Sequence, residues 1–305
     1  MNALTHLVRA AGFPPRSPPP LPLISAPFRD LDFSDLPPLQ RYSARDRSAL
    51  GYRSYLTPHA QQSALLIHGS SASSESLHPL ASRLRQSGIN AYAIDVRGHG
   101  ISGTRGDTAY VGQLEDYIED FVASVLGGDR TATLVGFSSG GGFALRFAAS
   151  DRQTLFRGYL LLAPFLGANA PTTRAATRAW ASVSVPRIVA ISMLGQLGAR
   201  RFGHLPVIAF GIDTAAADRL TGAYSFRLWR NFAPHDDYAA DFRAAAQPMT
   251  LLVGDGDELF DATAYAPLLA RVSPMTRVRT VPGAGHITLT TSDVGITAIV
   301  DALTR

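Results

Sequence analysis

The chain has 305 residues, with 28 basic and 24 acidic side chains and no cysteine. Apolar residues make up 46% and charged residues 17%, a balance typical of a globular protein with a large core rather than of a disordered chain. The absence of cysteine excludes disulfides, thiolate nucleophiles and cysteine-ligated metals. Because every basic residue is arginine, Schiff-base chemistry and the phosphate-binding lysine of a P-loop are excluded as well.

The net charge of +4 does not predict nucleic-acid binding. The arginines are spread along the chain, and the one adjacent pair, Arg200 and Arg201, belongs to no basic run. The N-terminal stretch is too short and too polar for a signal peptide. The apolar run at 188–198 falls short of the roughly 20 residues that span a bilayer. We therefore expect a cytoplasmic protein that does not bind nucleic acid.

Residues 1–38 are rich in proline, which predicts an extended arm rather than a packed element. Two segments of alternating polarity follow, at 39–46 and 50–56, and the short polar turn between them predicts a β-hairpin. Short apolar runs then alternate with amphipathic stretches, in the order 64–69, 76–88, 91–95, 113–126, 133–136, 141–150 and 158–164. This alternation predicts βαβ units and a buried, mostly parallel sheet flanked by helices.

The alternation breaks after residue 165. Residues 166–247 contain irregular, alanine- and arginine-rich helical stretches around one apolar run at 205–212. Strand-like and helix-like segments then return, at 249–255, 262–272, 277–283 and 293–304. We therefore expect one α/β domain in two parts, 39–165 and 248–305, with a helical cap inserted at 166–247.

A glycine-rich motif, LVGFSSGGGFAL at 134–145, joins a predicted strand to a predicted helix. A P-loop would need lysine and serine or threonine where Gly142 and Phe143 stand, and no register fits a dinucleotide-binding G-x-G-x-x-G. The pattern that fits is G-x-S-x-G, formed by Gly136, Ser138 and Gly140. A serine at such a strand-to-helix turn is strained and exposes its hydroxyl, and the flanking glycines prevent collisions. We predict that Ser138 is a nucleophile.

A nucleophilic serine needs a base and a carboxylate that orients the base. On a fold with this strand-turn-helix motif they follow the serine in the order carboxylate, then histidine. The one histidine beyond residue 235 is His286, just after the last predicted strand. Four acidic residues compete for the carboxylate, and we predict Asp257, with Asp255 in reserve against Glu258 and Asp261.

Backbone N–H groups should stabilise the negative charge that develops on the substrate. The residue after the nucleophile, Ser139, is one expected donor. The loop after the strand 64–69 should supply the other, for which Ser70 is the first choice and Ser71 the second. We expect His68 to brace this loop without taking part in the chemistry.

Three of these motifs together resemble the α/β-hydrolase superfamily, and most closely its lysophospholipase and monoacylglycerol-lipase-like branch. They are the strand ending in His68 and Gly69, the turn DVRGHGISGTRGD at 95–107, and the G-x-S-x-G-G elbow. The resemblance covers about residues 60–165 and 248–290. It departs at Phe137 and Ser139, where such lipases commonly carry histidine and methionine.

The resemblance implies an α/β-hydrolase fold and cofactor-free hydrolysis of a carboxylic ester through an acyl-enzyme on Ser138, with the cap shaping access of the acyl chain. The expected partner is a small-molecule ester such as a monoglyceride or lysophospholipid, with transient contact to a membrane surface. No metal is expected, because the adjacent residues His235, Asp236 and Asp237 would point in different directions. The sequence carries no signal for an oligomeric state.

Other readings stay open. The same triad could cleave a thioester or support cofactor-free peroxidation. A proline-iminopeptidase-like enzyme would need cap carboxylates to hold a substrate ammonium, and five are available: Asp213, Asp218, Asp236, Asp237 and Asp241. A non-catalytic binding protein of the same fold would be expected to carry a broken triad.

Overall fold

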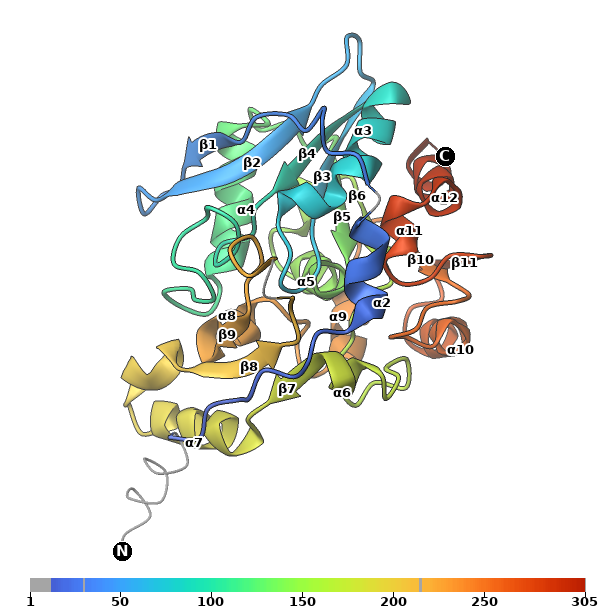
Figure 1. Ribbon diagram of the computed structural model, residues 1–305. Helices are drawn as coiled ribbons and strands as arrows, with labels where there is room; N and C mark the ends of the chain where they lie inside the picture. The colour runs from blue at the N-terminus through green and yellow to red at the C-terminus, as the bar shows by residue number, and fades with distance from the viewer. Residues whose placement is uncertain (1–11, 30, 214–215, 305) are drawn as a thin grey trace, which may run out of the picture.

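The fold is taken from a computed structural model that describes residues 12–29, 31–213 and 216–304. A sheet of eight strands lies at its centre, in the order β1-β2-β4-β3-β5-β6-β10-β11 (Figure 1). The strands are β1 Gln40–Ser43, β2 Ala49–Tyr55, β3 Gln62–Ile67, β4 Ile89–Ile94, β5 Thr133–Phe137, β6 Gly158–Leu162, β10 Met249–Gly254 and β11 Arg277–Val281. All six expected sheet strands from residue 64 onward are present.

The sheet is mostly parallel, as the sequence predicts. β1 and β2 form the expected antiparallel hairpin, with Tyr42 opposite Leu50, and β2 is also antiparallel to β4. The pairs from β4 to β11 are parallel. Their carboxyl ends therefore lie along one edge of the sheet, where loops of an α/β protein form ligand sites.

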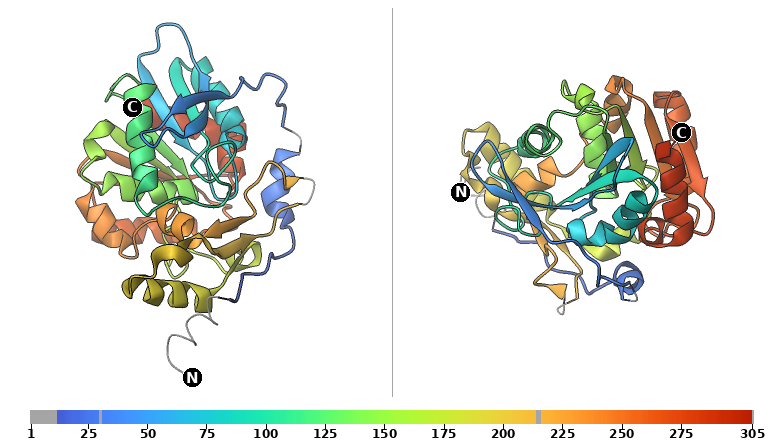
Figure 2. Two further views of the ribbon diagram at one scale, coloured as in Figure 1. Left: turned by 90° about the vertical axis from the view of Figure 1, so that its left-hand side faces the viewer. Right: turned by 90° about the horizontal axis from the view of Figure 1, so that it is seen from above.

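Helices cover both faces of the sheet (Figure 2). On one face α3 contacts α11 and α12, and on the other α5 contacts α9, which contacts α10. The bounds are η2 Ser74–Leu77, α3 His78–Gln86, α4 Gln113–Ser124, α5 Ser139–Ala148, η3 Gln153–Leu155, α9 Tyr238–Ala244, α10 Ala262–Val272, α11 Thr288–Thr291 and α12 Asp293–Thr304. In the described residues, none of the helices is long and apolar enough to cross a membrane.

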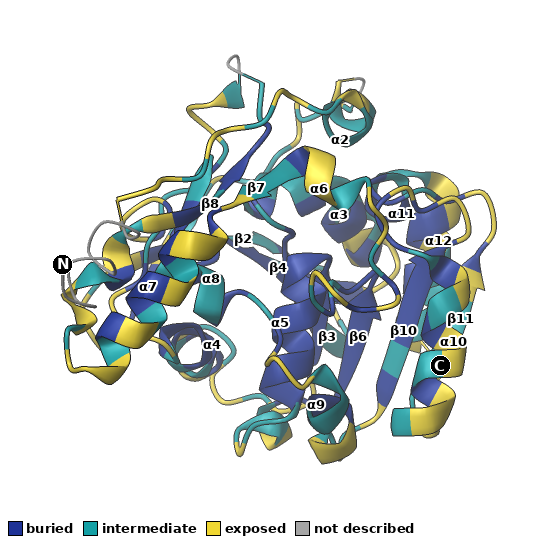
Figure 3. Ribbon diagram, turned by 90° about the horizontal axis from the view of Figure 1, so that it is seen from below, coloured by how far each residue is buried: buried dark blue, intermediate teal, exposed yellow. Residues whose placement is uncertain are grey.

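The core lies between these layers. Every residue of β5 and β6 is buried, as is most of β3 and β10, and α5 is buried along its whole length (Figure 3). A strand covered on both faces has no solvent side, so these segments read as continuous apolar runs in the sequence. The element that follows β5 is consequently held on all sides by packed neighbours.

The cap is inserted between the sixth and seventh strands of the large sheet, and α9, which lies within the expected cap range 166–247, packs against α5 instead. The cap contains more than helices, because three of its segments form an antiparallel sheet in the order β7-β8-β9. The central strand, β8, is the apolar run recognised in the sequence. The cap elements are α6 Thr177–Trp180, β7 Ala181–Val183, α7 Val185–Gln196, η4 Arg200–His204, β8 Pro206–Phe210, β9 Ala223–Ser225 and α8 Phe226–Asn231.

The proline-rich segment is packed, so the expectation of an arm without packed elements is wrong for its described part. It contains α2 Pro22–Ser25 and η1 Ala26–Phe28, and it runs along the cap toward the sheet (Figure 1). Apolar side chains of this segment pack against the core, namely Leu21, Leu23, Ile24 and Phe28. Residues 1–11 of the predicted arm lie outside the described part of the chain.

Candidate active site

The turn between β5 and α5 holds Ser138 in a strained conformation. Its φ is 56° and its ψ −116°, in a region that residues with side chains rarely adopt. A Cβ on Gly140 would stand 2.6 Å from the carbonyl oxygen of Ile67 in β3, and one on Gly136 would overlap the backbone at Gly140. The two flanking glycines therefore let strand, turn and helix approach closely, for the reason expected from the sequence.

The structure brings the three predicted triad residues together. His286 Nδ1 lies 2.8 Å from Asp257 Oδ2, and His286 Nε2 lies 3.1 Å from Ser138 Oγ. An ionised carboxylate can only accept hydrogen bonds, so Nδ1 carries the proton and Nε2 accepts from the serine hydroxyl. All three residues are buried. The arrangement matches the nucleophile, base and orienting carboxylate of a serine hydrolase.

The imidazole is held by more than the triad. The ring of Phe137 lies 4.9 Å from that of His286, and Phe260 meets it edge-on at 5.0 Å, measured between ring centroids. Glu258 Oε2 accepts a hydrogen bond from the backbone N–H of His286 at 2.8 Å. Phe137, which departs from the pattern of the lipases, thus packs on the predicted base.

The acidic cluster after β10 separates into distinct roles. Asp257 Oδ1 accepts hydrogen bonds from the amides of Leu259 and Phe260, so its two oxygens are both engaged and its position is well defined. Asp255, the reserve choice, instead accepts from the amide of Gly283 at 2.8 Å. The structure therefore places Asp257, and not Asp255, against the histidine.

The predicted oxyanion residues lie side by side. Ser139 is the first residue of α5, so its amide belongs to the free N-terminal end of a helix. The hydroxyls of Ser70 and Ser139 hydrogen-bond to each other, which places the two loops in contact. Ser71 is not equivalent to Ser70, because its amide already donates to Tyr224 Oη at 2.7 Å. Of the two loop candidates, Ser70 is the one whose amide is compatible with an oxyanion hole.

A buried hydrogen-bond network supports this loop from beneath. Tyr224 Oη of the cap also bonds to His99 Nε2 at 2.6 Å, linking the loop to the turn at 95–107. His68 Nε2 accepts from the amide of Val96, so His68 is neutral and its Nδ1 donates to the carbonyl of Gly69. His68 therefore braces the loop, as expected, and Tyr224 is a bracing residue that the sequence did not reveal.

A cavity of about 450 Å³ opens onto Ser138 and His286. Its core side carries Phe137 and Ile287, and its cap side carries Trp180, Ile212 and Leu220. A third wall comes from the N-terminal segment, with Leu21, Ile24 and Phe28. Sequence reasoning missed this wall because the prolines suggested a solvated arm. The available signal was the apolar spacing in LPLISAPF, at 21–28, which repeats every three to four residues.

The cap carboxylates considered for binding an ammonium group are largely occupied elsewhere. Asp236 pairs with Arg230, Asp241 with His235, and the Asp237 side chain caps α9. One of the five, Asp213, lines the cavity. Among the described residues, no group of three or more histidine and acidic side chains could hold a metal ion.

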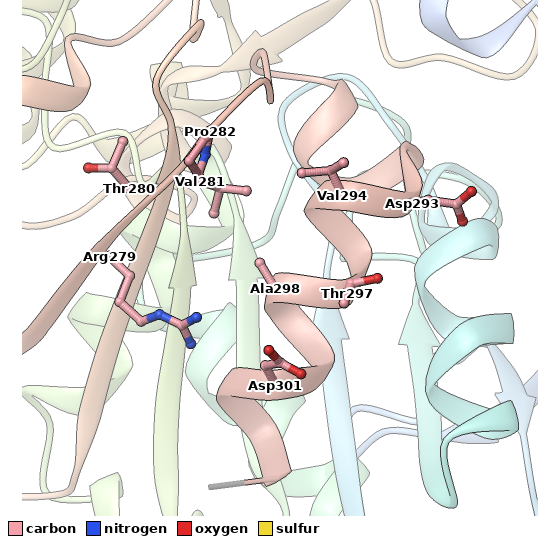
Figure 4. Close-up of a pocket in the computed structure, with 9 residues that line it drawn as sticks. All are labelled: Arg279, Thr280, Val281, Pro282, Asp293, Val294, Thr297, Ala298 and Asp301. Atoms are coloured by element: carbon pink, nitrogen blue, oxygen red, sulfur yellow. The ribbon is translucent and has the colours of Figure 1, made fainter.

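A second cavity, of about 420 Å³, lies between β11 and α12 (Figure 4). Its lining includes Arg279 and Asp301, and none of the predicted site residues contributes to it. It is therefore separate from the cavity at Ser138.

Tyr224→Phe should destabilise the protein, because it leaves the buried amide of Ser71 without an acceptor. We expect the free energy of unfolding to fall by about 1–3 kcal/mol in urea titrations. Tyr92→Phe, whose hydroxyl lies outside this network, is the control and should change little. Equal effects of the two substitutions would contradict the bracing role.

The stability of the protein should decrease in mild acid. Burial lowers the pKa of both His68 and His99 below the ordinary 6.5, and a charge on either would repel the other. Below about pH 6.5 the unfolded chain therefore binds protons that the folded protein does not bind, so unfolding becomes easier as the pH falls. Each histidine contributes a slope of up to about 1.4 kcal/mol per pH unit.

Urea titrations between pH 7 and 5.5 measure this slope. His99→Gln should reduce it, whereas His59→Asn, at an exposed histidine with positive φ, should leave it unchanged. An identical slope in wild type and His99→Gln would show that the buried pair is not its source.

Comparisons with known proteins agree with this fold. Solved structures with the same fold include a monoacylglycerol lipase from Paleococcus ferrophilus, with a TM-score of 0.62 and 22% identity over 83% of this chain and 98% of that one. A soluble variant of the monoglyceride lipase of Saccharomyces cerevisiae, solved with a substrate analogue, matches with a TM-score of 0.64 and 19% identity over 88% and 94%. A thioesterase domain from the curacin biosynthetic pathway matches with a TM-score of 0.58 and 16% identity over 88% and 100%.

At these identities the likeness shows the α/β-hydrolase fold and not the substrate. No curated protein sequence matches the chain. The family described as serine aminopeptidase, S33 matches residues 58–293, which include the elbow, the cap and the predicted triad. The chain is an α/β-type hydrolase and belongs to the S33 serine aminopeptidase family.

Proposed function

We propose that the protein hydrolyses a carboxylic ester with a lipid-like acyl group, using Ser138 as nucleophile, His286 as general base and acid, and Asp257 as the residue that orients His286. The observation that carries the proposal is the hydrogen-bonded chain from Ser138 Oγ through His286 to Asp257 at the floor of a largely apolar cavity.

In the first half of the reaction, Ser138 Oγ attacks the ester carbonyl carbon while its proton moves to His286 Nε2. The carbonyl oxygen becomes an oxyanion and accepts hydrogen bonds from the amides of Ser139 and Ser70. Collapse of this intermediate breaks the bond to the alcohol oxygen, and His286 returns the proton to that oxygen. The products are the free alcohol and an acyl group on Ser138.

In the second half, water takes the place of the alcohol. His286 Nε2 removes a proton from the water as it attacks the acyl carbon, and the oxyanion again forms between the two amides. The intermediate collapses by releasing Ser138 Oγ, which regains its proton from His286. Asp257 stays ionised throughout and stabilises the imidazolium that forms in each half.

The cavity lining supports an uncharged, apolar acyl group over an ammonium-bearing substrate. An aminopeptidase needs a carboxylate to bind the substrate amine. Two carboxylates, Asp213 and Glu75, line the cavity, and Glu75 is already paired with Arg219 at 2.9 Å. The apolar lining residues instead suit a hydrocarbon chain, whose transfer from water to such a wall is favourable. The monoglyceride lipases that share the fold act on substrates of this kind by name.

A series of p-nitrophenyl esters from acetate to dodecanoate tests the proposal. Wild type should hydrolyse them with a preference for medium or long chains, and Ser138→Ala should lose about four orders of magnitude or more in kcat/KM. Amino-acid p-nitroanilides and an acyl thioester are run in parallel. Faster turnover of the anilides would favour the peptidase, and turnover of the thioester alone a thioesterase. Absence of turnover on all of them would favour a binding protein.

Asp257→Asn should lower kcat on p-nitrophenyl butyrate by about a thousandfold to ten-thousandfold, because an amide at this position can donate to Nδ1 and favour the wrong histidine tautomer. Asp255→Asn is the matched control, since Asp255 bonds to Gly283 instead of the histidine. It should stay within a few-fold of wild type. A larger loss in Asp255→Asn than in Asp257→Asn would reverse the assignment.

A further inference from the structure

The N-terminal segment, defined here as residues 20–29, forms one wall of the cavity at Ser138 although it lies more than a hundred residues away in the chain. Its residues share this cavity with Ser138 and His286. The segment precedes the residues matched by the family, which begin at 58. It is therefore a feature of this chain that the family match does not describe.

The chain just before the segment, at residues 13–19, is attached to the cap by specific contacts. Ser184 Oγ donates to the carbonyl oxygen of Phe13 at 2.6 Å. Farther along, a Cβ on Gly211 would stand 3.0 Å from the carbonyl carbon of Pro19 and closer still to its oxygen, so the two backbones touch. These contacts fix the chain just before α2 begins and thereby position α2 at the edge of the cavity.

One face of the segment is turned toward the cavity. Leu21, Ile24 and Phe28 line it, at spacings of three and four residues that place them on one side of the short helices α2 and η1. All four large apolar side chains of the segment pack against the core, and of these four only Leu23 does not also line the cavity. The segment thus presents an apolar stripe to the cavity, and Ser25 and Arg29 of the same segment also line it.

One other wall of the cavity differs in chemistry from this stripe. The loop after β3 contributes hydroxyls to the same cavity, from Ser70, Ser73 and Ser76, together with the ion pair of Glu75 and Arg219. These walls would fix the orientation of a substrate with one apolar and one polar portion, because only the apolar portion gains by leaving water at the stripe.

We propose that the N-terminal segment is the acyl-binding wall of the enzyme, and that Ile24 and Phe28 set its preference for acyl-chain length. The inference rests on the proposed ester hydrolysis. The acyl chain of the substrate lies along the stripe while its carbonyl is at Ser138, and the alcohol portion faces the hydroxyl-bearing loop. The segment contributes to binding and takes no part in bond breaking.

Two ester series separate the acyl side from the alcohol side. In the first, p-nitrophenyl esters vary in acyl length from acetate to dodecanoate. In the second, alkyl acetates vary in alcohol length. Ile24→Ala removes contacts to the chain, and each lost methylene contact is worth a factor of about four. We expect kcat/KM for dodecanoate to fall about tenfold relative to acetate, with the alkyl acetate series unchanged.

Leu23→Ala is the matched control, a similar loss of volume on the neighbouring residue, which packs against the core but does not line the cavity. It should leave the chain-length profile unchanged, and Phe28→Ala should change it in the same direction as Ile24→Ala. An unchanged profile in Ile24→Ala, the same change in Leu23→Ala, or an effect confined to the alcohol series would each overturn the proposal.

Calorimetric binding of dodecanoate gives a readout that needs no turnover. Its Kd should rise about tenfold in Ile24→Ala and stay constant in Leu23→Ala. If wild type cleaves no ester but binding shows this difference, the proposed function fails and the acyl-binding wall stands. If wild type cleaves esters and both variants bind and react like wild type, the wall fails and the proposed function stands.

Discussion

The site depends on one strained residue. Ser138 occupies a conformation with positive φ that costs about 1–3 kcal/mol, and it persists because the elements around it are packed too tightly to relax. β5 and α5 are buried along their full length, and the glycines at 136 and 140 let the turn lie against β3. The rigid sheet thus supplies the precision with which the hydroxyl meets His286.

The parallel strands explain why distant residues meet at this point. β5 ends at the serine, the loop after β10 carries Asp257, and the loop after β11 carries His286. The strands are parallel and adjacent through β6, so their carboxyl ends lie on one edge and the loops share one space. Each loop is then fixed locally, as when Asp257 accepts the amides of two following residues.

The core and the triad could be predicted from the sequence because their signals are local. Continuous apolar runs mark buried strands, and the elbow needs glycine at defined positions around Ser138. The choice between Asp255 and Asp257 was harder, since it depends on how a short loop turns after β10. The role of Tyr224 could not be predicted, because it depends on a hydrogen bond with the amide of Ser71, which is 153 residues away in the chain.

The packing of the N-terminal segment could not be predicted from its composition. Residues 13–20 form no helix or strand, whereas the apolar residues from Leu21 to Phe28 gain by packing and lie in and beside short helices. Composition indicates the conformation that a segment adopts on its own. Its packing depends on distant parts of the chain, such as the cap backbone at Gly211. In the described structure, core, cap and this segment together enclose the predicted nucleophile.

The most direct test of the central claim is the site of covalent labelling by an alkyl fluorophosphonate, which reacts with activated serines. After labelling, digestion and mass spectrometry of the peptide that contains residues 134–146 locate the adduct. We predict a single adduct on Ser138 that forms far more slowly in His286→Ala. An adduct on Ser139 or on a serine of another loop, or equal labelling without the histidine, would contradict it.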